Sequence, residues 1–278
     1  MYSGTTLTSY SGHLFGAHQK IDRVARRHLE RLAPGCPFPH VKAILHFEGY
    51  NGPDAIKRKS PAKDEPWHYM QPFDTTDTQL LEIIDGHYIK LVAALKQSDH
   101  IRAAFEAAWL SHAIVDGLTP AHHYPYEEKL VELRGGEGVE SRTTFKDKVL
   151  FPGSSLRDQA SNNWKFWGPK GLFTTHWTFE WGVATLIKPL RMLHALPTNN
   201  DMQLLQASSL GDWYRDMAQM VAKQHLYDDF YEYGWTARLG RQIRQELGPT
   251  LVRSVTLVWY AAARDAGIAD NTLLGQGA

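Results

Sequence analysis

Helical periodicity is the sequence feature that most limits what this chain can fold into. Between residues 18 and 33 the apolar residues recur at three- and four-residue spacing: Ile21, Val24, Ala25, Leu29 and Leu32. That spacing puts them on one stripe of a helix. No stretch shows the alternation typical of half-buried strands, and no internal repeat is visible. The chain is therefore predicted to be all-α, a single-domain multi-helix bundle over residues 1–278 whose long loops gather at one end.

Turn and capping residues divide the chain into expected helices. They are placed at residues 18–33, 41–47, 78–97, 100–117, 174–196, 202–228, 232–246 and 250–266. Pro34-Gly35 closes the first of them, and Ser98-Asp99 caps the helix that starts near residue 100. Residues 37–77 are expected to be mostly loop. Residues 124–173, rich in Gly, Ser, Asn and charge, are expected to form an irregular insertion.

Composition narrows the function classes. The formal net charge is +0, so electrostatics do not favour nucleic acid or an anionic membrane as partner. The single cysteine, Cys36, excludes an intrachain disulfide and a cysteine-based zinc site. There is no apolar run of about 18 residues, and no basic, apolar leader. The chain as given is expected to be cytoplasmic, or secreted if a leader has been removed. The 14 histidines favour metal binding.

The run from residue 112 to residue 122 carries a compact set of metal-ligand types. His112 and Asp116 are four residues apart, so a helix places both on one face. Pro120 ends the regular helix, and His122 follows on the turn. Imidazole and carboxylate together are ligands that zinc prefers. A single such pair is more often a surface ion pair, but His176-x-x-x-Glu180 repeats the geometry, which indicates a multi-metal hydrolytic site.

These motifs resemble the zinc-dependent phospholipase C superfamily, which also contains the fungal single-strand-specific nucleases. The central motif of that family is His-x-x-x-Asp-x-x-x-Pro-x-His, and His112, Asp116, Pro120 and His122 fill all of its defined positions. The motif that follows is His-x-x-x-Glu in the phospholipases and His-x-x-x-Asp in the nucleases. The pair at residues 176 and 180 matches the phospholipase form.

Two earlier motifs extend the resemblance. The family has an aspartate about fourteen residues before a histidine that an aromatic residue follows. Asp54, His68 and Tyr69 fit this pattern, and Gly16-Ala-His18 fits the start of the first family helix. The motifs lie within residues 13–180, and the remainder of the chain resembles the family only in being helical.

The chain also departs from the family. There, the mature chain starts with a tryptophan whose α-amino nitrogen and carbonyl oxygen bind one zinc. Here no tryptophan precedes Trp67, and His13 stands five residues before His18, at the position of that tryptophan. We expect the His13 imidazole to replace the amine. The insertion at 124–173 is longer than in the family and is expected to form a wall or lid over the site.

The resemblance implies up to three Zn²⁺ ions per chain. The first would be held by Asp54, His68, His112 and Asp116. The second would be held by His122, His176 and Glu180. The third would be held by His18, Asp116 and His13, with Asp116 bridging the first and third.

The implied activity is that of a zinc-dependent phosphoric diester hydrolase in which metal-bound hydroxide is the nucleophile and Asp54 accepts a proton. The expected substrate is a phospholipid or related phosphodiester, with transient membrane-surface contact and no obligate protein partner. Trp67 and Tyr69 are candidates to contact a choline-like headgroup through cation–π interactions or to stack on a nucleobase. The alternatives are a single-strand-specific nuclease and a non-catalytic, metal-stabilised binding module.

Overall fold

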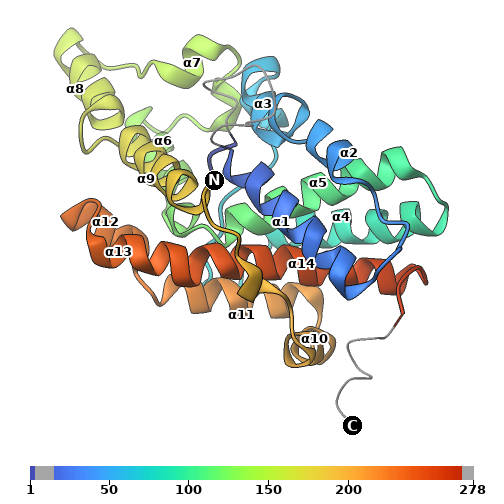
Figure 1. Cartoon of the computed structure of the whole chain (residues 1–278). Coiled ribbons are helices and arrows are strands. Elements are labelled where there is room, and N and C mark those ends of the chain that lie inside the picture. Colours follow the sequence, from blue (N-terminus) through green and yellow to red (C-terminus); the bar gives the residue numbers. More distant parts are fainter. Residues whose placement is uncertain (4–15, 271–278) are drawn as a thin grey trace.

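A computed structural model describes residues 1–3 and 16–270, apart from the side chains of residues 57 and 58, and these residues form helices without any strand. The all-α prediction is confirmed (Figure 1). The first half contains α1 (Ala17–Leu32), α2 (Val41–His46), η1 (Gly49–Asn51), α3 (Pro53–Lys59), η2 (Ala62–Asp64), α4 (Gln79–Lys96), α5 (His100–Gly117) and η3 (Pro120–His123). The second half contains α6 (Tyr126–Leu133), η4 (Val139–Ser141), α7 (Phe145–Val149), α8 (Leu156–Trp167), α9 (Leu172–Ile187), η5 (Leu193–Ala195), α10 (Asn199–Gln206), α11 (Leu210–Ala222), α12 (Leu226–Tyr233), α13 (Ala237–Gln242), the π-helical turn η6 (Ile243–Leu247) and α14 (Gly248–Asp265).

The main core forms where α14 packs against α1, α4 and α5. Between Leu251 and Ala263 every residue of α14 except Arg253 is buried, as expected for a helix surrounded by others. The indole Nε1 of Trp259 donates a hydrogen bond to the Ala107 carbonyl of α5 over 3.1 Å. This contact fixes α5 in the centre of the molecule, with its C-terminal end directed toward the candidate site.

The segment predicted to be an irregular insertion contains several helices joined by irregular stretches. Residues 124–173 contain α6, α7 and α8, and a separate small apolar cluster is formed by Tyr126, Leu130, Phe151 and Phe166. Capping explains these helices. Thr144 and Asp147 form a reciprocal capping box at α7, and the Ser155 hydroxyl accepts from the Asp158 backbone at α8. The Gly-, Ser- and Asn-rich composition of this segment favoured a loop prediction, although these polar residues cap the N-termini of helices.

Several predicted helix boundaries were also wrong. The helix expected at 202–228 is broken into α10, α11 and α12, because Ser209 caps α11 and His225 adopts a left-handed conformation with φ of 52°. The predicted loop at 37–77 contains α3 as well as the short helix α2. The helix predicted at 174–196 ends at Ile187. In the part of the chain that the structure describes, no helix has the length and apolar character needed to cross a membrane.

Candidate metal centre

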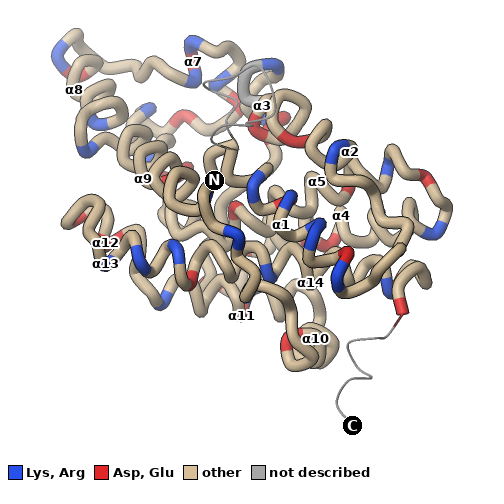
Figure 2. The backbone as a smooth tube through the Cα atoms, in the orientation of Figure 1, with Lys and Arg blue, Asp and Glu red and all other residues tan. Residues whose placement is uncertain are grey.

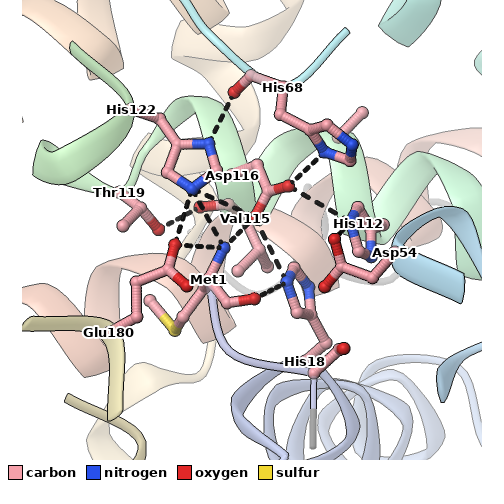
Figure 3. Close-up of polar contacts among 12 residues, drawn as sticks. Met1, His18, Asp54, His68, His112, Val115, Asp116, Thr119, His122 and Glu180 are labelled. Atoms are coloured by element: carbon pink, nitrogen blue, oxygen red, sulfur yellow. Dashed lines mark hydrogen bonds and ion pairs between the residues drawn. The ribbon is translucent and has the colours of Figure 1, made fainter. Parts of the chain in front are cut away.

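The candidate site is formed at the C-terminal end of α5, where this helix meets α1, α3, α9, η3 and the segment around residue 68 (Figure 3). Gly117, the last residue of α5, has no room for a side chain. A Cβ there would collide with the Tyr214 hydroxyl and with Leu80. The same hydroxyl donates to the Ile114 carbonyl over 2.9 Å. Close packing behind Gly117 thus holds the end of the helix, and Asp116 with it.

Asp116 is the centre of the site, and its side chain is 1% exposed. Its Oδ2 lies 2.7 Å from His68 Nδ1 and 3.1 Å from His112 Nε2. Its Oδ1 lies 3.2 Å from His18 Nε2 and contacts the α-amino nitrogen of Met1. Burial raises the pKa of this carboxyl, but the Met1 ammonium and the surrounding imidazoles outweigh that effect and hold it well below its usual value. Asp116 is therefore an anion shared by four nitrogen-bearing groups.

A second group of ligand types surrounds Glu180 of α9. Its Oε1 lies 2.7 Å from His122 Nε2 and 3.0 Å from His176 Nε2. The Nδ1 of His122 lies 2.7 Å from the His68 carbonyl and therefore donates to it, which leaves Nε2 as the unprotonated nitrogen of a neutral ring. Burial and the Met1 ammonium together lower the pKa of His122 to about 4, although Asp116 and Glu180 act in the opposite direction. A lone pair on Nε2 and a carboxylate oxygen thus face each other, an arrangement that needs a cation between or beside them.

The α-amino group of Met1 is the cation that meets these lone pairs in the structure. Besides Asp116, its nitrogen lies 3.1 Å from Glu180 Oε1 and 3.3 Å from His122 Nε2. The Met1 carbonyl oxygen lies 2.7 Å from His18 Nε2. Burial opposes the charge of this ammonium, but Asp116, Glu180 and Asp54 together raise its pKa above the usual value. His13, expected to supply this nitrogen, lies outside the described residues.

The remaining carboxylate predicted for the site, Asp54, lies in the first turn of α3. Its Oδ1 is 3.9 Å from His112 Nε2, and its side chain is 16% exposed, against 1% for Asp116. Ligand atoms of Asp54, His68 and His112 all lie within 4.8 Å of one another, so the three could hold one metal ion. Compared with Asp116 and Glu180, Asp54 therefore combines a position beside His112 with greater access to solvent.

Glu48 belongs to the site and was not found from the sequence. It is 1% exposed, and its Oε1 accepts a hydrogen bond from His112 Nδ1 over 3.1 Å. This bond directs His112 Nε2 toward Asp116 and Asp54. His18, Glu48 and His112 also form a third group that could hold a metal ion. No periodic pattern marks Glu48, since it follows α2 in a short connection and reaches α5 only through the tertiary fold.

Aromatic rings close one side of the site. The Tyr69 ring is stacked between His122, at a centroid distance of 5.2 Å, and Tyr126 of α6, at 5.3 Å. Tyr126 also lies 5.0 Å from the His176 ring. Burial is the main reason that the pKa of Tyr69 is raised well above its usual value, which keeps the phenol neutral. Trp67 is half-buried and packs edge-on against Tyr69 and against the main core.

The structure therefore brings together the side chains predicted as metal ligands that lie within its described part: His18, Asp54, His68, His112, Asp116, His122, His176 and Glu180. They come from segments up to 162 positions apart in the printed sequence. His123, next to His122, is not among them, because its Nε2 donates to the Gly117 carbonyl over 2.8 Å. Comparison of the chain with protein-family models, with curated proteins and with solved structures gave no match.

Proposed function

We propose that this protein is a zinc-dependent phosphoric diester hydrolase that resembles the phospholipase C superfamily. The observation that carries the proposal is the convergence of the motif residues predicted as zinc ligands around one buried aspartate. Histidines 68, 112, 122 and 176 lie close together and not in separate parts of the molecule. Ring centroids of His68 and His112 are 5.3 Å apart, and those of His122 and His176 are 5.0 Å apart.

The donor set fits zinc. Nitrogen and oxygen ligands in groups of three or four are typical of zinc sites, and open positions are typical of catalytic ones. One ion would be held by Asp54, His68, His112 and Asp116, and a second by His122, His176 and Glu180. A third would be held by His18 and Asp116 together with the Met1 amine and carbonyl, in the position for which we had expected the His13 imidazole to replace the amine of the family. Zinc bound there would lower the pKa of a coordinated water toward about 7 and neutralise phosphoryl oxygens.

The side chains of the chain have separable tasks in such a reaction. Asp54, the carboxylate with access to solvent, accepts the proton released from the attacking water. Asp116 is already surrounded by nitrogen donors and acts as the shared ligand that keeps two positions close together. Tyr69 and Tyr126 exclude water from one side of the centre and position His122 and His176 by stacking.

The phospholipase form is favoured over the nuclease because residue 180 is glutamate and because helix α8, which leads into α9, carries exposed tryptophan side chains. Trp67, which is half-buried beside the metal ligands, is proposed as the ring contact for the substrate headgroup, because both faces of Tyr69 are covered by His122 and Tyr126. Single-strand-specific nuclease activity is the second candidate, since the same indole ring can stack on a base. A metal-stabilised binding module is the third.

Metal content and turnover separate these functions. We expect about three zinc ions per chain by elemental analysis. We also expect hydrolysis of bis-p-nitrophenyl phosphate that a chelator abolishes and added zinc restores. Parallel assays on phosphatidylcholine and single-stranded DNA distinguish phospholipase activity from nuclease activity. A chain that binds no zinc, or that binds zinc without hydrolysing any of these phosphodiesters, would refute the enzyme proposal.

A further inference from the structure

Exposed apolar side chains are concentrated in one short part of the molecule. Six large hydrophobic residues within residues 139–167 are exposed to solvent: Val139, Phe145, Leu150, Leu156, Trp164 and Trp167. Seventeen such residues are exposed over the whole described part of the chain, so a stretch of about a tenth of its length holds a third of them. Isolated exposed residues are ordinary, but exposed apolar side chains concentrated in one segment of the chain are typical of an interaction surface.

Helix α8 carries the centre of this surface. Leu156, Trp164 and Trp167 recur at eight- and three-residue spacing, which places them on one side of the helix together with Ala160. Leu156 is 86% exposed and Trp164 is 68% exposed. The adjacent side carries Phe166, which is 4% exposed and packs on Phe151 at 4.4 Å, and the Trp167 indole is tied to this packed side because its Nε1 donates to the Val149 carbonyl over 2.9 Å. Helix α8 thus has one apolar side packed on the protein and a second apolar side directed to solvent.

Positive charge accompanies the apolar surface. Residues 142–170 contain six Lys and Arg residues and two Asp residues, and two of the six cations, Arg142 and Lys148, pair with Glu127 and Glu65. Lys146, Arg157, Lys165 and Lys170 are exposed. Figure 2 shows basic positions on α7 and at the far end of α8, on the same part of the molecule. Tryptophan side chains mixed with lysine and arginine are typical of surfaces that enter the headgroup region of a bilayer.

The surface is connected directly to the candidate metal centre. Helix α8 leads through a short turn into α9, which carries His176 and Glu180, and the Thr174 hydroxyl donates to the Trp167 carbonyl over 2.9 Å. From the same segment, Tyr126 stacks on Tyr69 beside His122. A body seated on α8 would therefore lie next to the elements that hold the metal ligands (Figure 1).

We infer that the exposed side of α8, with Phe145 and Leu150, docks on the surface of a phospholipid bilayer that contains anionic lipid. The occupant is assigned from the combination of exposed indoles, aliphatic side chains and excess positive charge. The inference rests on the proposed function only in choosing lipid rather than protein as that occupant. Docking of this kind places the indoles at headgroup depth without any helix spanning the bilayer.

The test is co-sedimentation of the full chain with vesicles of phosphatidylcholine and phosphatidylserine. The double variant Leu156→Ser/Trp164→Ser is expected to lower the partition coefficient at least about tenfold, because it removes two large side chains that would be buried at the interface. Leu204→Ser is the matched control, because Leu204 is 55% exposed and belongs to α10, which lies far from α8 in Figure 1. The Leu204→Ser variant is expected to bind vesicles as the unchanged protein does. A second variant, Arg157→Gln/Lys165→Gln, is expected to weaken binding only to vesicles with phosphatidylserine.

Hydrolysis of soluble bis-p-nitrophenyl phosphate is measured in parallel and is expected to be unchanged in every variant. Absence of vesicle binding by the unchanged chain would overturn the inference, as would equal binding by the Leu156→Ser/Trp164→Ser variant. A dimer in light scattering that the double variant dissociates would also overturn it, because the surface would then join two copies of the chain. Vesicle binding without phosphodiester hydrolysis would refute the proposed function and leave the docking surface standing.

Discussion

The hydrogen bond between Glu48 and His112 gives the most direct test of how the site is organised. Glu48 is 1% exposed and accepts from His112 Nδ1 over 3.1 Å, while its second oxygen lies 3.3 Å from the Gly49 backbone nitrogen. The bond keeps a proton on Nδ1 of His112 and holds the ring so that Nε2 faces Asp116 and Asp54, where it would offer its lone pair to a metal ion once its own proton has left. Removing Glu48 would therefore disturb His112, a proposed metal ligand, while leaving in place every residue of the three proposed zinc ligand sets.

The size of the effect follows from the kind of contact. Loss of a hydrogen-bonding partner behind a metal-bound histidine typically lowers metal affinity about 10- to 100-fold, which corresponds to about 1.4–2.7 kcal/mol. Glu48→Ala removes the acceptor entirely and is expected near the upper limit. Glu48→Gln retains an acceptor oxygen but loses the charge, so we expect it near the lower limit. Burial and the negative charge of Glu48 raise the pKa of the neighbouring Asp22 carboxyl, so this pKa should fall in the glutamine variant.

The assay is a titration of metal-free protein with zinc against a competing chelator, repeated with cobalt, whose absorption spectrum reports the ligand geometry. Glu106→Gln is the matched control. Glu106 is an equally buried carboxylate of α5, but it pairs with His87 over 2.5 Å rather than with a site histidine. We expect this control to lower the thermal stability and to leave zinc affinity unchanged. Zinc affinity and cobalt spectra that are the same in Glu48→Ala and in the unchanged chain would show that the contact does not organise the site.

The same geometry leads to three further predictions. Adding Gly-Ser ahead of Met1 converts the buried amine into a peptide nitrogen, so elemental analysis should show one zinc fewer per chain. The His13→Ala variant should keep its full zinc content. Loss of zinc in His13→Ala but not in the extended chain would instead identify the His13 imidazole as the ligand. Asp116→Asn removes the anion that His18, His68 and the amine share, so loss of two zinc ions and of most activity is expected, and full zinc content would exclude the bridging role. Burial lowers the pKa of His123 to about 4, so the folded protein keeps this ring neutral while the unfolded chain protonates it below about pH 6.5. Stability should therefore fall as the pH decreases from about 6.5 toward 4, and calorimetry of His123→Gln should show a smaller loss over that range than the unchanged chain; identical curves would contradict the assignment.

The parts of the site that the sequence predicts are those that depend on local geometry. Helical spacing alone puts His112 and Asp116 on one face, and the Pro120 turn then brings His122 near them, where its Nε2 is 4.0 Å from Asp116 Oδ1. The contacts of these residues with His68 and Glu180 depend on tertiary packing. Only the family resemblance suggested that these side chains would lie together.

The sequence does not predict the features of the site and fold that depend on long-range contacts, on the backbone or on local capping. Glu48 acts through a contact between residues 64 positions apart, and no local pattern encodes such a contact. The Met1 amine is a backbone group, so its position is invisible to any inspection of side-chain types. The helices within residues 124–173 begin at polar caps such as Ser155, in a composition that otherwise favours loops, and their apolar residues are too few to show a clear stripe.

Charge balance gives an argument for bound cations that does not depend on any resemblance. Glu48, Asp116 and Glu180 are each at least 90% buried, and Asp54 lies beside them. Buried carboxylates are stable as anions only when positive charge or several hydrogen-bond donors compensate them.

In the structure, two groups that supply positive charge to these carboxylates are the Met1 ammonium and His112, whose pKa the flanking carboxylates raise well above its usual value despite burial. His122, between the same carboxylates, is held neutral, with a pKa of about 4. The four carboxylates therefore depend on protons held by an amine and an imidazole. A divalent cation bound there would supply positive charge in their place and release those protons, so its binding at this centre would depend on pH.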